Sequence, residues 1–363
     1  MKRLFLILSL WVLVCPFGGV RGQELETNTA EVPIAWLRPA PLLRMPGEVD
    51  CNSPAHWSGN RLIIFNSLDA QTHSLPVRNA GLNFNRLRGN VKVGFDDQGQ
   101  WNGRRWIEAT HKATNGRLYG WYHNEPNLEC PGLTAPRIGA AWSDNDGLTW
   151  HNLGIVLEAP PGTENCAYAN GYFTGGHGDF SVIADQSKRY YYFFFTNYAG
   201  PEGEQGVAVA RMALTDRDDP VGKVWKWSNG TWREPGVGGH VTPVFNTWRS
   251  WENADPDSFW GPSVHWNTHL KSFVILLNRT AYGWGDWRQE GIYLTFNPRL
   301  SNPAGWSVPQ KIQHGGGWYP QVLGMDTTKR ETDKLAGQVA RFFVHGSSTN
   351  EIVFVKPGEA LQP

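Results

Sequence analysis

Two aspartates stand at the beginning of stretches that predict β-strands, where carboxyl groups can do acid–base chemistry. Asp50 lies in Asp50-Cys51-Asn52-Ser53-Pro54, and Asp179 lies in Gly178-Asp179-Phe180-Ser181-Val182. A carboxyl group with a raised pKa can donate a proton while an ionised one acts as base or nucleophile. We therefore expect Asp50, Asp179 and Glu108 to be the catalytic residues. The competing interpretation of either aspartate is a turn-capping role, because Asp commonly bonds its local backbone.

A second set of residues has the chemistry of a sugar-binding surface. Aromatic faces stack on sugar rings, while amides and carboxylates hydrogen-bond to hydroxyl groups. The predicted substrate-binding residues are His123, Asn124, Glu125, Asn197, Asp257, Trp260, Asn278, Arg279, Trp318 and Tyr319.

Five repeats provide the elements that would position these side chains. Each repeat has a first strand, a polar turn and an intensely apolar second strand, which is too short for a helix. The apolar runs span residues 62–65, 118–122, 190–195, 273–277 and 341–344. The residues that follow them are Asn66, Asn124, Asn197, Asn278 and His345. Repeats at a spacing of about 50 to 80 residues predict an all-β, five-bladed β-propeller with four-stranded antiparallel blades. The alternative is an irregular β-sandwich.

The propeller is expected to occupy residues 46–363, with residues 23–45 as an N-terminal segment. The last repeat shows only one clear outer strand, 351–355, so the segment 32–37 is expected to pair there and close the ring. In such a ring, the starts of the inner strands and the loops after the second strands meet at one face. This geometry would bring the candidate residues into one pocket.

The N-terminus predicts export. Lys2 and Arg3 precede an apolar run over 4–14, and small residues follow near 20–22. This pattern is typical of a cleaved signal peptide, here 1–22, and the run is short for a bilayer span. A retained anchor is the alternative. We expect a secreted or periplasmic protein that has no membrane attachment after cleavage.

Composition narrows the class further. Lys+Arg and Asp+Glu each number 33, so no basic surface for nucleic acid is indicated. The 19 Trp, 41 Gly and 24 Pro favour a β-rich globular fold over disorder. After the signal, Cys51, Cys130 and Cys166 allow one disulfide, and their spacing neither chooses the pair nor resembles a zinc site. We expect no cofactor and no catalytic metal, while structural calcium and the oligomeric state stay open.

The repeat pattern and the two aspartates resemble the five-bladed glycosidases of the arabinanase and β-xylosidase type, over nearly the whole mature chain. The resemblance implies that Asp50 is the base and that Asp179 tunes a pKa and orients. It also implies a Glu at the start of the fourth blade that donates a proton as the general acid, but this chain has Phe259-Trp260-Gly261-Pro262 there. Asp257, Glu108, Glu125 or Glu290 would have to supply that proton.

A second resemblance concerns residues 143–150, Ser-Asp-Asn-Asp-Gly-Leu-Thr-Trp, which are similar to the Asp-box of sialidases. That box is a turn between a third and a fourth strand, far from the active site, so its expected role here is structural. Two functions remain. The first is a glycoside hydrolase that acts on a glycan through paired carboxylates, and the alternative is a non-catalytic carbohydrate-binding propeller.

Overall fold

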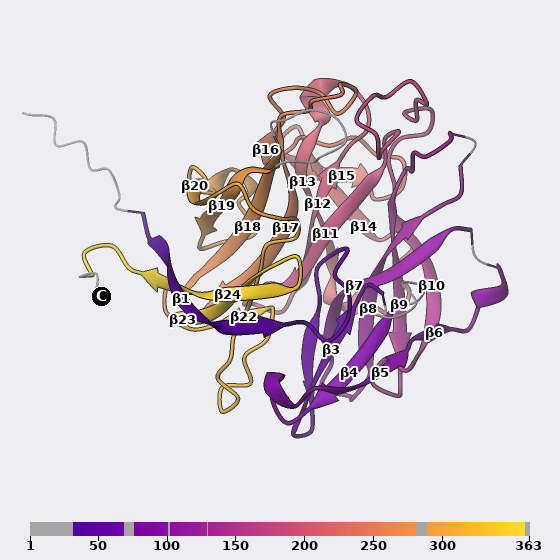
Figure 1. The fold of residues 1–363 in the computed structure, drawn as a ribbon. Helices are drawn as coiled ribbons and strands as arrows, with labels where there is room; N and C mark the ends of the chain where they lie inside the picture. The colour runs from indigo at the N-terminus through magenta and orange to yellow at the C-terminus, as the bar shows by residue number, and fades with distance from the viewer. Residues whose placement is uncertain (1–31, 69–75, 101, 129, 281–288, 360–363) are drawn as a thin grey trace, which may run out of the picture. The chain divides into compact units, whose positions relative to one another are not determined.

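The computed structural model describes residues 32–68, 76–100, 102–128, 130–280 and 289–359. Within these ranges the strands form five sheets, and the predicted all-β, five-bladed propeller is confirmed (Figure 1). The predicted signal peptide, 1–22, lies outside the described residues. No helix in the described ranges is long and apolar enough to span a bilayer.

The first three blades run from their inner strand outward as follows. The first is β2 (Ala55–Ser58), β3 (Arg61–Asn66), β4 (Val77–Gly81) and β5 (Arg88–Lys92). The second is β7 (Arg104–Lys112), β8 (Leu118–Glu125), β9 (Arg137–Ser143), β10 (Thr149–Leu157) and the short β6 (Gly94–Phe95). The third is β11 (His177–Ala184), β12 (Tyr190–Asn197), β13 (Gly206–Ala213), β14 (Val224–Ser228) and β15 (Thr231–Pro235), with β16 (Phe245–Asn246) pairing with β13.

The remaining two blades contain the C-terminal half of the ring. The fourth is β22 (Leu335–Ala336), β17 (Ser258–Asn267), β18 (Ser272–Thr280), β19 (Gln289–Asn297) and β20 (Gln310–His314). The fifth is β21 (Gln321–Leu323), β23 (Val339–Val344), β24 (Ser347–Val355) and β1 (Ile34–Arg44). Short 3₁₀ turns occur at Phe84–Arg86, Gln98–Gln100, Glu202–Glu204, Leu214–Asp216 and Pro303–Gly305. Three blades thus carry more than the four strands predicted. Two of the additions, β6 and β22, pair in parallel with β10 and β17.

The first described strand lies beside the last one. β1 pairs antiparallel with β24, from Ile34 opposite Val355 to Arg44 opposite Ser347. It is longer than the segment 32–37 considered from the sequence. A half-exposed ion pair of 2.7 Å joins Arg38 and Glu351 across the two strands. The fifth sheet therefore combines both ends of the described chain.

The apolar second strands are buried on both faces because a neighbouring blade covers each side. In β12, Tyr191 and Phe193 pack with Trp121 of the second blade. Tyr192 and Phe194, which point to the opposite face, pack in the cluster that contains Ile275 of the fourth blade. Successive side chains of a strand alternate in direction, so a continuous apolar run predicts two buried faces.

The Asp-box-like segment forms the turn between β9 and β10, the third and fourth strands of the second blade. The Ser143 hydroxyl accepts a hydrogen bond from the Gly147 amide at 2.9 Å. The completely buried Trp150 donates its indole N–H to the Gly147 carbonyl and packs edge-on against Phe65 of the first blade. The turn thus packs the second blade against the first, and none of its residues lines the carboxylate pocket.

Candidate active site

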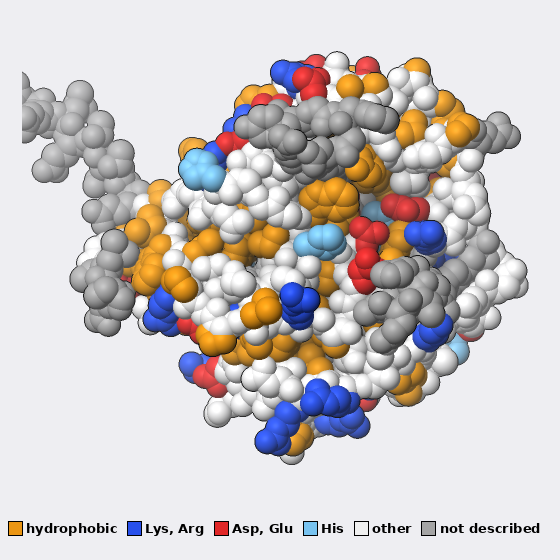
Figure 2. All heavy atoms as spheres, viewed as in Figure 1, with side chains coloured by type: hydrophobic (Ala, Val, Ile, Leu, Met, Phe, Trp, Pro, Cys, Tyr) orange, Lys and Arg blue, Asp and Glu red, His pale blue; other side chains and the backbone are white. Residues whose placement is uncertain are grey.

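A pocket of about 550 Å³ opens where the inner strands begin. We call it the carboxylate pocket. Its walls come from the first, second, third and fifth blades. The lining residues used below are Asp50, Arg104, His123, Glu125, Tyr172, Phe173, Asp179, Trp318 and Tyr319. On the face in view in Figure 2, acidic side chains gather beside hydrophobic ones.

Asp50 enters the pocket from the loop before β2. Its backbone amide donates to the Ser67 hydroxyl at 2.8 Å, which holds the loop against the end of β3. Burial, followed by the negative charge of Glu125, raises the pKa of Asp50 to about 6. This carboxyl therefore changes charge in the mildly acidic range, where a general acid or base is most useful.

Asp179 reaches the pocket through a backbone irregularity. The pairing of β11 with β12 shifts between Gly178 and Phe180, and Asp179 takes a positive φ of 43°. Such bulges re-aim a side chain, and strained backbone is often found at functional sites. The Tyr198 hydroxyl donates a hydrogen bond to the Asp179 carboxyl. Burial nevertheless raises the pKa of Asp179 to about 7.

A carboxylate, an imidazole and a second carboxylate form a chain beneath and beside these aspartates. His123 Nδ1 lies 3.5 Å from Glu108 Oε2, and His123 Nε2 lies 3.5 Å from Glu125 Oε1. Glu108 is completely buried, and its Oε1 accepts the Phe180 amide at 2.9 Å. Burial alone would lower the pKa of His123, but the two facing carboxylates raise it well above its usual value. The Asp179 amide donates to His123 Nδ1 at 3.4 Å, and positive charge on this ring lowers the pKa of Asp50 and Asp179.

Aromatic residues of the third and fifth blades form one wall. Trp318 stacks on His345, with ring centres 6.0 Å apart, and its edge meets Tyr172 at 6.2 Å. Tyr319 has a φ of 53°, and its amide donates to Asn278 Oδ1 at 3.0 Å. These contacts hold Trp318, which is half-buried, with part of its surface facing the pocket.

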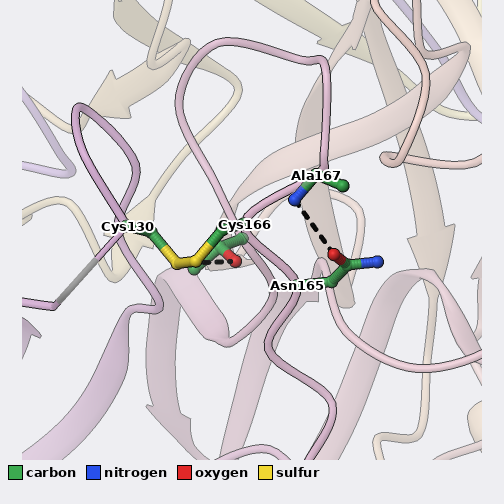
Figure 3. Close-up of a disulfide and its surroundings, with 5 residues drawn as sticks. Cys130, Asn165, Cys166 and Ala167 are labelled. Carbon is green, nitrogen blue, oxygen red and sulfur yellow. Dashed lines mark hydrogen bonds between the residues drawn. A yellow bond between two sulfur atoms is a disulfide. The ribbon is translucent and has the colours of Figure 1, made fainter.

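A disulfide fixes a second part of the wall. The loop after β8 contributes several lining residues between Pro126 and Thr134. Cys130 is bonded to Cys166, which lies 36 residues further along the chain (Figure 3). Cys51 is a buried free thiol. The Thr134 amide also donates to the Tyr172 carbonyl at 2.8 Å. This wall is thus tied to the loop that precedes β11.

Three of the predicted substrate-binding asparagines brace loops instead of lining the pocket. Asn124 donates to the carbonyls of Asn102 and Arg104, and Asn197 donates to those of Ala199 and Glu204. Asn278 binds the Gly317 carbonyl and the Tyr319 amide. Each lies at the end of a second strand, so the repeated Asn is explained by backbone hydrogen bonding at equivalent places.

Trp260, which was also predicted to bind substrate, does not line the carboxylate pocket. Its side chain is completely buried, its indole N–H donates to Gln289 Oε1 at 2.9 Å, and it lies edge-on to Tyr319. It supports the aromatic wall without reaching the pocket.

Two further charged candidates, Asp257 and Arg279, form a two-armed ion pair with each other, at 2.8 and 2.9 Å, and do not line the pocket. Glu290 is paired with Lys311 and is likewise absent from the lining. Of the four residues considered as substitutes for the missing fourth-blade Glu, Glu125 alone lines the carboxylate pocket among the described residues.

Sequence reasoning gave no role to Arg104 and Tyr198. Arg104 is the first residue of the inner strand β7, and Tyr198 directly follows the second strand β12. These positions, at the face where the pocket was expected, could have marked both residues as candidates. Over the described ranges, no group of three or more His, Cys, Asp or Glu side chains is arranged to hold a metal ion.

Comparisons with known proteins by sequence find no match. No family model matches the chain, and no curated protein matches it. Similar solved structures include an exo-1,5-alpha-L-arabinanase from a bovine ruminal metagenomic library, with 11% identity, coverage of 86% of this chain and 94% of that one, and a TM-score of 0.49. An endo-arabinase from Bacteroides thetaiotaomicron has 11% identity, coverage of 88% and 95%, and a TM-score of 0.49. An exo-beta-1,3-galactanase from Phanerochaete chrysosporium has 10% identity, coverage of 86% and 64%, and a TM-score of 0.48.

Proposed function

We propose that the protein hydrolyses glycosidic bonds in the carboxylate pocket. The observation that carries this proposal is that Asp50 and Asp179, from two different blades, share one pocket with the aromatic wall of Trp318. Glycoside hydrolysis requires one carboxyl group that stays protonated and another that is ionised at the working pH. An aromatic wall supplies a surface on which a sugar ring stacks.

The order of the two pKa values, together with the deeper burial of Asp179, supports one division of roles. Between about pH 6 and pH 7, Asp179 is still mainly protonated while Asp50 is mainly ionised. Asp179 is then the proton donor to the leaving glycosidic oxygen, and Asp50 is its ionised partner. This assignment gives Asp179 a more direct role than the resemblance implies, and it removes the need for a Glu in the fourth blade.

Glu108 and His123 are positioning residues in this scheme. Glu108 accepts the Phe180 amide, so it holds the backbone next to Asp179. The ring of His123 lies between Glu108 and Glu125, and positive charge on it opposes the rise in the pKa of both aspartates. Glu125 and Arg104 lie at the pocket surface, where they can bind sugar hydroxyl groups.

One observation favours the alternative of sugar binding without cleavage. Among the described residues, the fourth blade contributes nothing to the lining of the carboxylate pocket, and its inner strand carries the buried Trp260 at the place expected for the acid. A propeller with the same aromatic wall would then bind a glycan and release it unchanged.

The discriminating experiment measures both binding and turnover on a broad panel of oligosaccharides. We expect turnover in the wild type, with a pH profile whose limbs lie near 6 and 7. Asp50→Asn and Asp179→Asn should bind the same glycan and fail to cleave it, because Asn keeps the shape and removes the titrating group. Binding without turnover in the wild type would support the alternative, and full turnover in either variant would overturn the assignment.

We also propose that the chain is exported after cleavage near Gln23. The charged and apolar pattern before this point and the disulfide between Cys130 and Cys166 support this, because disulfides persist in oxidising compartments. Mass spectrometry of the exported protein should find a new N-terminus close to Gln23. A full-length product retained in the cytoplasm would contradict the proposal.

A further inference from the structure

A second cavity of about 580 Å³ lies where the inner strands end. We call it the cationic pocket. Its lining comes from the last residues of β2, β7, β11 and β17, from the turn after β11, and from the loop between β21 and β22. The lining residues that matter most are His56, Trp57, Lys188, Trp266, Arg330 and Lys334. The carboxylate pocket uses the beginnings of the inner strands, so the two cavities occupy opposite ends of them.

Positive charge dominates this lining. Lys112, Lys188, Arg330 and Lys334 contribute four cations, whereas Asp185 contributes one carboxylate. Lys112 is paired with Asp146, and Lys334 lies 3.2 Å from Asp333 and donates to the Ser181 hydroxyl at 2.6 Å.

Lys188 and Arg330 are exposed, and neither forms an ion pair with any acidic residue in the described ranges. Two cations are therefore available to an incoming anion.

A buried imidazole adds an unused polar group. His56 is 4% exposed, lines the cavity, and its Nε2 has no hydrogen-bond partner in the described part of the chain. Burial lowers the pKa of His56 to about 3 and that of His111 to about 4. Both rings are therefore neutral at physiological pH. A buried polar atom without a partner costs free energy, which a ligand hydroxyl group would recover.

Two half-buried indoles complete the lining. Trp57 and Trp266 line the cavity, and the guanidinium of Arg330 lies 5.4 Å from the centre of the Trp57 ring. An inorganic anion would use the cations and leave the aromatic surface and the unpartnered imidazole unused. A sugar ring that carries an acidic group would use all three, since aromatic faces stack on sugar rings and cations bind carboxylate or sulfate.

We propose that the cationic pocket binds an acidic saccharide, a sugar ring that bears a carboxylate or sulfate group. Lys188 and Arg330 bind the acidic group, the indole of Trp57 or Trp266 contacts the ring, and His56 Nε2 bonds a hydroxyl group. This site is separate from the carboxylate pocket and does not depend on hydrolysis there.

The test compares trigalacturonate with the neutral galactotriose of the same linkage, which differ only in the carboxylate groups. Calorimetry on the full chain should show binding of the acid and little binding of the neutral sugar. Lys188→Gln and Arg330→Gln should each weaken binding about tenfold, and the double variant about a hundredfold, because each removes one charge-assisted hydrogen bond. Inorganic sulfate should compete only weakly.

The chain offers a matched control. Lys271 occupies the same kind of hairpin turn in the fourth blade, with a φ of 54° against 52° for Lys188, and does not line the cavity. Lys271→Gln should bind trigalacturonate as the wild type does. Trp318→Ala should also retain this binding, since Trp318 belongs to the carboxylate pocket.

Three results would overturn the proposal. Equal binding of the acidic and the neutral trisaccharide would remove the role of the cations. Sulfate that binds as tightly as the trisaccharide would indicate an anion site only. Binding that is lost in Trp318→Ala and kept in the double variant would place the acidic sugar in the carboxylate pocket. A failure to hydrolyse any glycan would leave all three comparisons intact, so the two proposals fail separately.

Discussion

The two ends of the inner strands present pockets of nearly equal volume and opposite charge. Long loops build the carboxylate pocket, and a disulfide ties one of them down, whereas short turns build most of the cationic pocket. Asp179 sits on a bulged, positive-φ backbone, while Lys188 sits in an ordinary hairpin turn with a positive φ. The same strands can therefore support one pocket in which buried carboxyl groups face one another and another in which paired and exposed cations gather.

The largest effect should come from the titrating groups of the carboxylate pocket. If the proposed hydrolysis occurs, Asp50→Asn and Asp179→Asn should each lower kcat by about 10²- to 10⁴-fold, as expected for a lost general acid or base. Lys271→Gln, which also removes one charge but at an exposed turn outside both pockets, should leave kcat unchanged. Steady-state kinetics measure both. A loss of kcat of less than about tenfold in either Asn variant would indicate that the carboxyl group contributes only charge to the pocket and does not transfer a proton.

The next effect concerns stability and pH. The folded pKa of Asp179, about 7, exceeds its ordinary value of 3.8. The folded protein therefore holds this proton more tightly than the unfolded chain does, and ionisation of Asp179 opposes folding. The contribution of protonated Asp179 to the free energy of unfolding is fully present below about pH 4 and is lost as the pH rises towards 7. Asp179→Asn should remove this loss and be more stable than the wild type at pH 8, by up to about 4 kcal/mol. Denaturation at pH 4 and pH 8 measures it, and a difference independent of pH would refute the buried neutral acid.

Loss of the disulfide should affect ligand binding in the carboxylate pocket and leave binding in the cationic pocket unchanged. Replacing Cys130 and Cys166 by Ser should lower the free energy of unfolding by about 3 kcal/mol, because the bond closes a long loop in the unfolded chain. Because Cys130 lines the carboxylate pocket, glycan binding there should weaken while trigalacturonate binding to the cationic pocket stays unchanged. Denaturant titration and calorimetry test both parts. Equal losses at the two pockets would contradict their separation.

The smallest effect should come from the aromatic wall. Trp318→Ala should weaken glycan binding by up to about tenfold, because one aromatic contact contributes about 0.5 to 1.5 kcal/mol. The loss should appear in KM and leave kcat nearly unchanged, because stacking acts on the ground state and the transition state alike. Trp260→Phe is the control: it alters a buried ring behind the wall and should change KM less. A larger KM effect from Trp260→Phe would mean that Trp260 contacts the sugar.

Local sequence patterns were enough to predict the architecture. Apolar runs such as 190–195, closed by Asn197, predict strands buried on both faces, and their repetition predicts five blades. These inferences hold because they depend on local pattern: alternation along a strand and turn chemistry are written in neighbouring residues. The same reasoning put Asp50 and Asp179 at the starts of inner strands.

Which side chains reach a pocket could not be predicted in the same way, because it depends on how the strands pair and how the blades pack. The inner strands contain register shifts at Ile107/Ala109, Gly178/Phe180 and Trp260/Ser263. One extra residue reverses the facing of the side chains around it, so the spacing that predicted strands could not predict that Trp260 is buried or that Glu108 lies beneath the pocket. The pairing of Cys130 with Cys166, and the gathering of Lys188 and Arg330, depend on segments far apart in sequence that meet only when the ring closes.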